Sequence, residues 1–171
     1  MKIAVWNIRG LGSVEKKVTV RKLIKDEHID MMGLVETKHS DFSLWDIRKI
    51  WGNQDVGWVH SSAVNGSGGL VVFWHHDAFK GIRSLITQRW ICVFGKFLEE
   101  DFECAVCVVY APNNQRERLE LWNDLRAVRQ QMSSPLVMMG DFNEVLTIEE
   151  RRNATQRTVG MRDLGDFIQD L

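Results

Sequence analysis

Short runs of consecutive apolar residues alternate along the chain with longer segments in which apolar residues recur every three or four positions. The runs predict buried strands, because a strand covered on both faces is apolar at every position, and the longer spacing predicts helices with one buried face. Strands are predicted at 3–6, 31–35, 58–60, 70–74, 82–87, 90–98, 102–110 and 136–139. Helices are predicted at 14–28, 42–51, 115–132 and 159–171. The mixture predicts an α/β fold.

Glycine and charged residues mark the predicted connections. Gly52 follows the helix 42–51 as a C-terminal cap, and Glu99-Glu100-Asp101 forms a charged hairpin turn. The segment Asn65-Gly66-Ser67-Gly68-Gly69 is interpreted as a hairpin-like connection. A glycine loop can also hold phosphate, but this one neither opens a helix nor carries the lysine of a P-loop. The closely spaced strands between 82 and 110 predict an antiparallel part of the sheet.

Length and composition indicate one globular domain covering residues 1–171, which buries about two-thirds of its unfolded surface. Hydrophobic content of 44% and charged content of 26% exclude disordered and fibrous classes. A net charge of −1 gives no overall field that attracts nucleic acid or an anionic membrane, so a polyanion must be held locally. Neither a membrane span nor a signal peptide is expected from the pattern of apolar residues.

The three cysteines, Cys92, Cys104 and Cys107, all fall in apolar strand segments and are interpreted as buried hydrophobic residues. Cys104 and Cys107 form a Cys-x-x-Cys pair, but a second pair that would complete a zinc site is missing. An odd number of cysteines suits a reducing compartment, so the expected location is nuclear or cytoplasmic. The seven tryptophans have core packing as their default role.

Four predicted strands end on polar side chains that can do chemistry. Asn7, Glu36 and Tyr110 each follow an apolar strand, and the last strand runs into a turn with Asp141 and Asn143. Each residue alone is weak evidence, because asparagine is common in turns and glutamate is common on surfaces. Together they predict a shared site, since strand ends of this kind tend to meet at one edge of a fold.

These residue types suit the hydrolysis of a phosphodiester. Mg²⁺ prefers a few carboxylate ligands with water and phosphate oxygen, and Glu36 and Asp141 could supply the carboxylates, either directly or by orienting water. Asn7, Asn143 and the Tyr110 hydroxyl could hold phosphate oxygens as charge builds up in the transition state. Because serine and cysteine do not occur here in a nucleophile motif, water is the expected nucleophile.

Five short motifs, spread over nearly the whole chain, match a known protein family in the same order. They are Trp6-Asn7-Ile8-Arg9-Gly10, Glu36-Thr37-Lys38, Gly68-Gly69-Leu70 with Phe73-Trp74, Tyr110-Ala111-Pro112-Asn113, and Gly140-Asp141-Phe142-Asn143. With them the sequence resembles the endonuclease/exonuclease/phosphatase superfamily. Within it, the chain is most similar to the apurinic-like endonuclease domain of LINE-type (non-LTR) retrotransposons of plants.

The resemblance implies a four-layer α/β sandwich of two packed mixed β-sheets flanked by helices, here lacking the last strands. It implies a site that binds Mg²⁺, with Mn²⁺ as a substitute. Glu36 would be the principal metal ligand, with Asn7 and Asp141 close to the metal. Asp141 would position the attacking water, Asn143 would orient the phosphate, and Tyr110 would assist from the other side.

The same resemblance implies DNA as substrate. Asn113 matches a phosphate-contacting asparagine, and Arg116 stands where related enzymes have a DNA-contacting arginine. In the parent polyprotein such a domain nicks target DNA and leaves a 3′-hydroxyl for the reverse transcriptase domain.

The sequence departs from the family after Asn143. Family members continue with strands that bear an aspartate and a Ser-Asp-His segment, so the chain is expected to be C-terminally incomplete and weak or inactive as an enzyme. The five histidines lie elsewhere: His28, His39, His60, His75 and His76.

Two alternatives therefore stay open. One is a non-catalytic interaction module that associates with itself or a partner through an uncovered edge strand. The other is a phosphodiesterase of phosphoinositides or sphingolipids, although the Tyr-Ala-Pro-Asn motif, followed by an arginine three residues after Asn113, favours nucleic acid.

Overall fold

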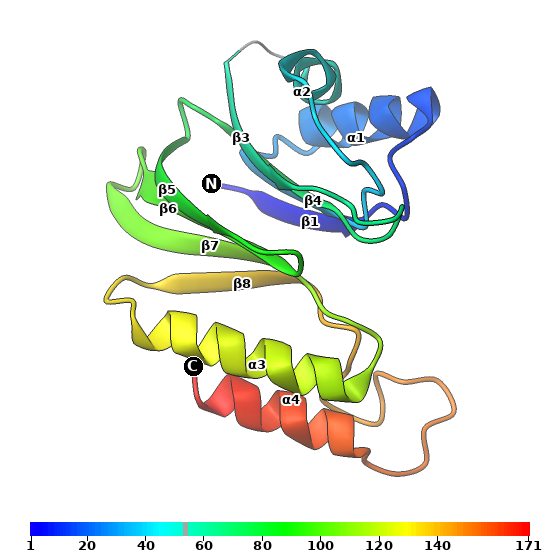
Figure 1. Ribbon diagram of the computed structural model, residues 1–171. Helices are drawn as coiled ribbons and strands as arrows, with labels where there is room; N and C mark the ends of the chain where they lie inside the picture. The colour runs from blue at the N-terminus through cyan, green and yellow to red at the C-terminus, as the bar shows by residue number, and fades with distance from the viewer. Residues whose placement is uncertain (53–54) are drawn as a thin grey trace. The chain divides into compact units, whose positions relative to one another are not determined.

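The computed structural model describes residues 1–52 and 55–171 and divides them into two compact units. Unit 1 comprises Met1–Tyr110 and Ser134–Asp141, and unit 2 comprises Ala111–Ser133 and Phe142–Leu171. This division does not test the expectation of a single domain over residues 1–171, which stays a prediction. The elements of unit 1 are β1 (Ile3–Asn7), α1 (Val14–Asp26), β2 (Met31–Val35), α2 (Leu44–Trp51), β3 (Val56–Ser61), β4 (Leu70–His75), β5 (Phe79–Ile86), β6 (Trp90–Phe97), β7 (Phe102–Tyr110) and β8 (Leu136–Asp141) (Figure 1). Unit 2 contains α3 (Gln115–Gln130) and α4 (Val159–Gln169).

Unit 1 is built on two mixed β-sheets. The first sheet has the strand order β1-β2-β4-β3 and the second has the order β5-β6-β7-β8. Each sheet contains one parallel pair, β1 with β2 and β7 with β8, and its other neighbours are antiparallel. The predicted α/β class with two mixed sheets is confirmed, as is the antiparallel arrangement of the strands between 82 and 110.

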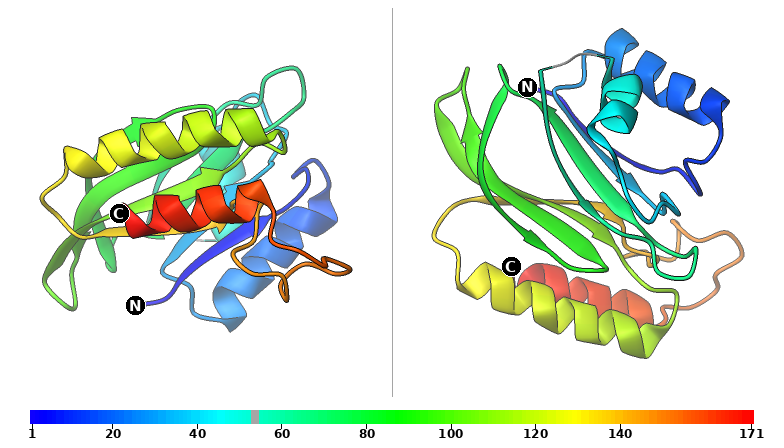
Figure 2. Two further views of the ribbon diagram at one scale, coloured as in Figure 1. Left: turned by 90° about the horizontal axis from the view of Figure 1, so that it is seen from below. Right: turned by 45° about the horizontal axis from the view of Figure 1, so that its top comes forward.

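The two sheets lie face to face around a buried apolar core, as the right-hand view of Figure 2 also shows. The core includes Met31 and Val72 from the first sheet and Ile91 and Val106 from the second, all with no exposed surface. Gly33 lies at a point of close approach, because a Cβ atom there would stand 2.8 Å from the side chain of Val108. The predicted burial of the three cysteines is confirmed.

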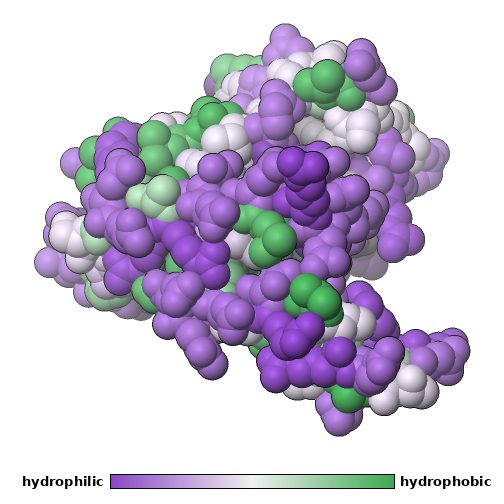
Figure 3. All heavy atoms as spheres, turned by 60° about the horizontal axis from the view of Figure 1, so that its bottom comes forward, coloured by the Kyte–Doolittle hydropathy of each residue, from purple (hydrophilic) through white to green (hydrophobic). Residues whose placement is uncertain are grey.

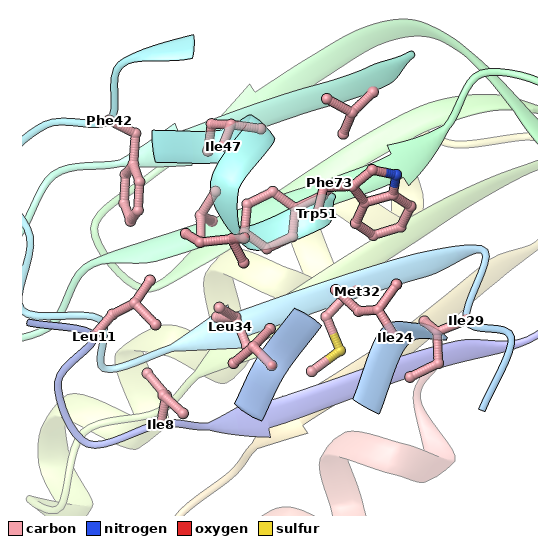
Figure 4. Close-up of a cluster of buried hydrophobic side chains, with 14 residues drawn as sticks. Ile8, Leu11, Ile24, Ile29, Met32, Leu34, Phe42, Ile47, Trp51 and Phe73 are labelled. Carbon is pink, nitrogen blue, oxygen red and sulfur yellow. The ribbon is translucent and has the colours of Figure 1, made fainter. Parts of the chain in front are cut away.

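A second apolar core lies between the first sheet and the helices α1 and α2 (Figure 4). Ile24 of α1 and Trp51 of α2 reach into it, and Phe73 of β4 meets the Trp51 ring at 6.0 Å. Helix α2 begins at Leu44, two residues after the predicted start, because Ser43 accepts a hydrogen bond from the Asp46 amide as N-cap. It ends where predicted, at Gly52 in the left-handed conformation.

Unit 2 is a pair of helices that run side by side in the same direction (Figures 1 and 2). Trp122 of α3 stacks on Phe167 of α4 with ring centroids 4.8 Å apart, and Phe142 lies 6.0 Å from the same indole. Asn114 caps α3 by accepting hydrogen bonds from two backbone amides, which confirms the predicted start of this helix.

Most differences from the predicted boundaries concern strand ends. Strand β5 begins at Phe79, three residues before the predicted start, because its antiparallel ladder with β6 continues to Phe97. Strand β8 continues through Gly140 to Asp141, since its parallel ladder with β7 extends to Tyr110. The start of β5 and the end of β8 are both set by pairing with a neighbouring strand. Runs of apolar residues do not reveal such pairing.

The face drawn in Figure 3 is mostly hydrophilic, with apolar residues in small separate patches. Within residues 1–52 and 55–171, no helix has the length and the apolar character that crossing a membrane requires.

Candidate functional site

The two parallel strand pairs of unit 1 bring four of the predicted site residues together. Asn7 is the last residue of β1 and pairs with Val35, so Glu36 follows directly at the end of β2. Tyr110 and Asp141 end β7 and β8 and are paired with each other in the parallel ladder. We call Asn7, Glu36, Tyr110 and Asp141 the strand-end site.

A hydrogen bond connects the two sheets within this site. The Asn7 Nδ2 amide donates to Asp141 Oδ2 at 2.7 Å, and both side chains are partly buried. The Asn7 Oδ1 atom accepts from the Arg9 backbone amide at 3.1 Å. Because the carbonyl oxygen of Asn7 faces a backbone donor, its NH₂ group is the end that meets the carboxylate. The carboxylate of Asp141 is therefore held in a defined orientation.

The backbone at Glu36 is held in an uncommon conformation. Glu36 has a φ of 58°, in the left-handed region that residues with a side chain seldom adopt. Its carbonyl accepts from the Gly10 amide at 2.7 Å, and the Thr37 amide donates to the carbonyl of Gly69 at 3.0 Å. Backbone bonds on both sides thus stabilise the turn that presents the Glu36 side chain.

The glycine-bearing segment 65–69 supports this turn and confirms the hairpin-like connection. Val64 and Ser67 form an isolated bridge, and the carbonyl of Gly68 accepts from the Lys38 amide at 2.9 Å. Gly69 has a φ of 84°, and a Cβ atom there would stand 2.5 Å from the buried Thr37 hydroxyl. A larger residue could not approach this closely, so the glycine is explained by packing.

The Tyr110 hydroxyl lies in a negatively charged environment. Burial raises the pKa of Tyr110 above its ordinary value, and the charges of Glu36 and Asp141 raise it further. Arg89 opposes this effect by lowering the pKa. The phenol is consequently protonated at neutral pH and can donate a hydrogen bond. Tyr110 is also paired with Asp141 in the parallel ladder of β7 and β8, so the two residues lie at the same end of neighbouring strands.

The other predicted site residues belong to unit 2. The Asn143 Nδ2 amide donates to the carbonyl of Ala111 at 2.6 Å. The carbonyl of Asn113 accepts from Arg118 at 2.6 Å, so its backbone is fixed. The Arg116 side chain is 91% exposed and has Glu120 at 3.9 Å one helical turn away. Asn143 and Asn113 thus lie in hydrogen-bonded turns, whereas Arg116 is available at the surface.

A buried ion network in unit 2 was not predicted. Arg118 donates to Glu144 Oε2 at 2.9 Å, and Arg151 donates to Glu144 Oε1 at 2.8 Å. The side chains of Arg118 and Glu144 are only 9% and 3% exposed. The available signal was the position of Arg118 on the apolar face of its helix, one turn before Trp122, where a charged residue needs a buried partner.

The donor set of the strand-end site fits a magnesium ion. Within the described parts of the chain, no three His, Cys, Asp or Glu side chains form a cluster that could hold a metal. Mg²⁺ does not require one, because it binds through one or two carboxylates and otherwise keeps water and phosphate oxygen. Glu36 and Asp141 can supply those carboxylates, although Lys38 already stands 3.6 Å from Glu36 Oε1.

Three of the histidines have contacts of their own. His39 meets the carbonyl of Leu11 at 3.2 Å, His60 lies 3.5 Å from Asp41, and His75 lies 3.8 Å from Asp77. His60 also stacks on Trp58, which agrees with the packing role expected from the sequence.

The profile of the Endonuclease/Exonuclease/phosphatase family matches residues 4–163, and the chain belongs to this family. A curated relative is the exodeoxyribonuclease of Bacillus subtilis (strain 168), which is 26% identical over 152 residues. That match covers 84% of this chain and 58% of the relative, so the chain spans little more than half of the relative's length.

Solved structures of AP endonucleases have the same fold. The AP endonuclease from Archaeoglobus fulgidus matches with a TM-score of 0.74 and 16% identity, over 99% of this chain and 70% of that one. The catalytic domain of Xenopus laevis APE2 matches with a TM-score of 0.73 and 17% identity, over 98% of this chain and 67% of that one. These similarities confirm the fold class.

Proposed function

We propose that the chain is a Mg²⁺-dependent phosphodiesterase that nicks DNA and leaves a 3′-hydroxyl. The observation that carries the proposal is the hydrogen bond from Asn7 to Asp141, which fixes a carboxylate beside Tyr110 and Glu36 at the ends of two parallel strand pairs. The nuclease names of the curated relative and of the structural neighbours support DNA as the substrate class.

Each residue of the strand-end site has a role in this proposal. Glu36 and Asp141 hold Mg²⁺, which neutralises charge on the phosphate when it is bound. Asp141 also accepts a hydrogen bond from the attacking water and orients it toward phosphorus. Asn7 keeps the Asp141 carboxylate in place, and the protonated Tyr110 hydroxyl donates to a phosphate oxygen as negative charge develops.

The residues of unit 2 act on the substrate in the same proposal. Following the resemblance, Asn143 would orient the phosphate, and Asn113 would contact a phosphate of the DNA. Arg116, which is almost fully exposed, contacts the DNA backbone, where a guanidinium can bind two phosphate oxygens at once. Since the net charge of the chain is −1, such local contacts have to supply the affinity for DNA.

The biological setting is proposed from the resemblance described above. The chain would be the endonuclease domain of a plant LINE-type retrotransposon, acting in the nucleus or cytoplasm with the reverse transcriptase of the same polyprotein. The 3′-hydroxyl at the nick would serve as primer.

Nicking of supercoiled plasmid DNA with Mg²⁺ tests the function. Glu36→Gln and Asp141→Asn should each lower the rate about 100-fold or more, since each removes a charge placed at the reacting phosphate. Glu103→Gln and Asp77→Asn are matched controls, because both residues are exposed and neither lies at the carboxyl end of a strand in a parallel pair. A DNA polymerase should extend the nicked strand if the product carries a 3′-hydroxyl.

Two results would count against this function. If Glu36→Gln and Asp141→Asn both nick as fast as the wild-type chain, the strand-end site is not the active site. If plasmid stays intact while vesicles that contain phosphoinositide or sphingomyelin release a headgroup, the substrate is a lipid.

A second candidate function is self-association through the edges of the sheets. β1 and β8 end the strand orders of their sheets, and each pairs with one neighbouring strand. All residues of β1 are half-buried, and Val137 of β8 is 38% exposed. Unpaired edges with apolar side chains favour pairing with another chain. Sedimentation at rising concentration tests this, and a monomer throughout would exclude it.

A further inference from the structure

Lys16 is bound to the turn that follows strand β1. Its ammonium group donates to the backbone carbonyls of Ile8, Arg9 and Gly10 at 2.9, 3.0 and 2.8 Å. An ammonium has three protons, so these three bonds use its full donor capacity. Lys16 is half-buried in the first turn of α1, and its backbone amide donates a hydrogen bond to the side chain of Ser13. The lysine therefore occupies a defined position.

The turn that Lys16 binds has an unusual backbone. Arg9 and Gly10 have φ values of 49° and 93°, so two successive residues are in the left-handed region. This conformation brings three consecutive carbonyl oxygens close enough to share one cation. Carbonyl dipoles that point at the same place repel one another, and a positive charge between them removes that repulsion. Lys16 accordingly stabilises a turn that is strained at Arg9.

The same turn sets the orientation of Asn7. The Arg9 amide, which lies within the turn, donates to Asn7 Oδ1 at 3.1 Å. The opposite end of the Asn7 side chain donates to Asp141 Oδ2 at 2.7 Å. A continuous series of hydrogen bonds thus runs from Lys16 through the turn and Asn7 to Asp141, all within unit 1.

We propose that Lys16 is a positioning residue for the strand-end site, which acts by holding the turn 8–10 so that Asn7 orients the Asp141 carboxylate. The kinetic part of this inference rests on the proposed function, and its structural part does not. Lys17 is the natural comparison, because it carries the same charge on the same helix but pairs with Asp46 at 3.3 Å.

Nuclear magnetic resonance of the Asn7 side-chain amide is the structural test. This signal is identified by its absence in Asn7→Asp. In Lys16→Met it should move in the same direction as in Asp141→Asn, because both variants weaken the bond from Asn7 to Asp141. In Lys17→Met it should stay at the wild-type position. An unchanged Asn7 signal in a folded Lys16→Met variant would overturn the proposal.

Plasmid nicking gives the kinetic test. Lys16→Met should lower kcat by about 10- to 100-fold, the effect of displacing a catalytic group by a fraction of an ångström to 1 Å, with little change in KM for DNA. A loss confined to KM would contradict a positioning role. If the wild-type chain does not nick DNA, the proposed function fails, and the Asn7 signal alone decides the role of Lys16.

Chemical rescue separates positioning from general stability. In Lys16→Ala, added n-propylammonium should restore part of kcat and move the Asn7 signal back, because it supplies an ammonium where the side chain is missing. Propanol should do neither, since it lacks the charge. Lys16→Arg should stay impaired, because a planar guanidinium cannot direct three protons to one group of carbonyls as a compact ammonium does. If propylammonium and propanol act alike, the charge of Lys16 is not what holds the turn.

Discussion

The ion pair of Arg118 and Glu144 gives a prediction about stability. Arg118→Met or Glu144→Leu should each lower the free energy of unfolding by about 3–5 kcal/mol, the range found when one partner of a buried ion pair is removed. The cost arises because the remaining charge stays buried. The cost of Arg118→Met should be near the lower value, because Glu144 still accepts a hydrogen bond from Arg151 at 2.8 Å. Glu144→Leu should cost about the higher value, because Arg118 then loses its carboxylate and keeps its hydrogen bonds to the neutral carbonyls of Pro112 and Asn113.

The double variant distinguishes a coupled pair from two independent losses. Replacing both charges by apolar side chains removes the buried charge altogether, and such exchanges are often close to neutral. The double variant should therefore be no less stable than the worse single variant, with a coupling energy of roughly 3 kcal/mol. Against a total stability of about 5–15 kcal/mol, each single change would be visible as a large shift in the unfolding midpoint.

Urea unfolding followed by tryptophan fluorescence and circular dichroism is the assay. Trp122 reports on unit 2, because it stacks on Phe167. Arg126→Met with Asp170→Leu provides a matched cycle in the same unit, and this more exposed pair should show less than about 1 kcal/mol of coupling. If Arg118→Met and Glu144→Leu cost under about 1 kcal/mol each, or if their costs simply add, Arg118 and Glu144 are not coupled as a buried ion pair.

Three further predictions concern unit 1. Tyr110 is the only tyrosine of the chain, so a pH titration followed by ultraviolet absorbance reports on its hydroxyl alone. The midpoint is expected above 10.0, and both Asp141→Asn and bound Mg²⁺ should lower it. Because this pKa is higher in the folded state, stability should fall as the pH rises from about 10 through the midpoint, and a midpoint at the ordinary value would contradict this. Gly140→Ala should lower the free energy of unfolding in urea by about 1–3 kcal/mol or more. The φ of Gly140 is 151°, and a Cβ atom there would collide with the Val109 carbonyl. Gly33→Ala should cost about 1–3 kcal/mol by overpacking between the sheets, and wild-type stability would show that the sheets can separate slightly.

The sequence alone predicted the elements of the fold well. Apolar runs located the strands, and the three-to-four spacing located the helices, because both patterns follow from burial of one or two faces. The predicted first and last residues were less accurate for elements whose ends depend on a neighbouring strand or capping residue. The extent of β8 to Asp141 depends on its ladder with β7, and the start of α2 depends on the hydrogen bond to Ser43. Such limits require the identity of the neighbour.

The candidate site was predicted in part for a physical reason. Polar residues at the ends of apolar strands stand out against their surroundings, and this contrast singled out Asn7, Glu36 and Tyr110. Long side chains give no such contrast. Lys16 and Arg118 lie in helices rich in charge, where a lysine or arginine is ordinarily exposed. Their role depends on which carbonyls their ends reach, and those carbonyls belong to turns that the sequence pattern does not specify.

The location of the strand-end site follows from the topology of the two sheets. In an antiparallel sheet neighbouring strands end at opposite edges, so consecutive strand ends cannot gather in one place. Each sheet here contains a single parallel pair, and these pairs are β1 with β2 and β7 with β8. Because β1 and β8 also contact each other, the four carboxyl ends lie together and the amide of Asn7 can reach Asp141. A change that broke either parallel pair would therefore be expected to disperse the site while leaving most of the antiparallel ladders intact.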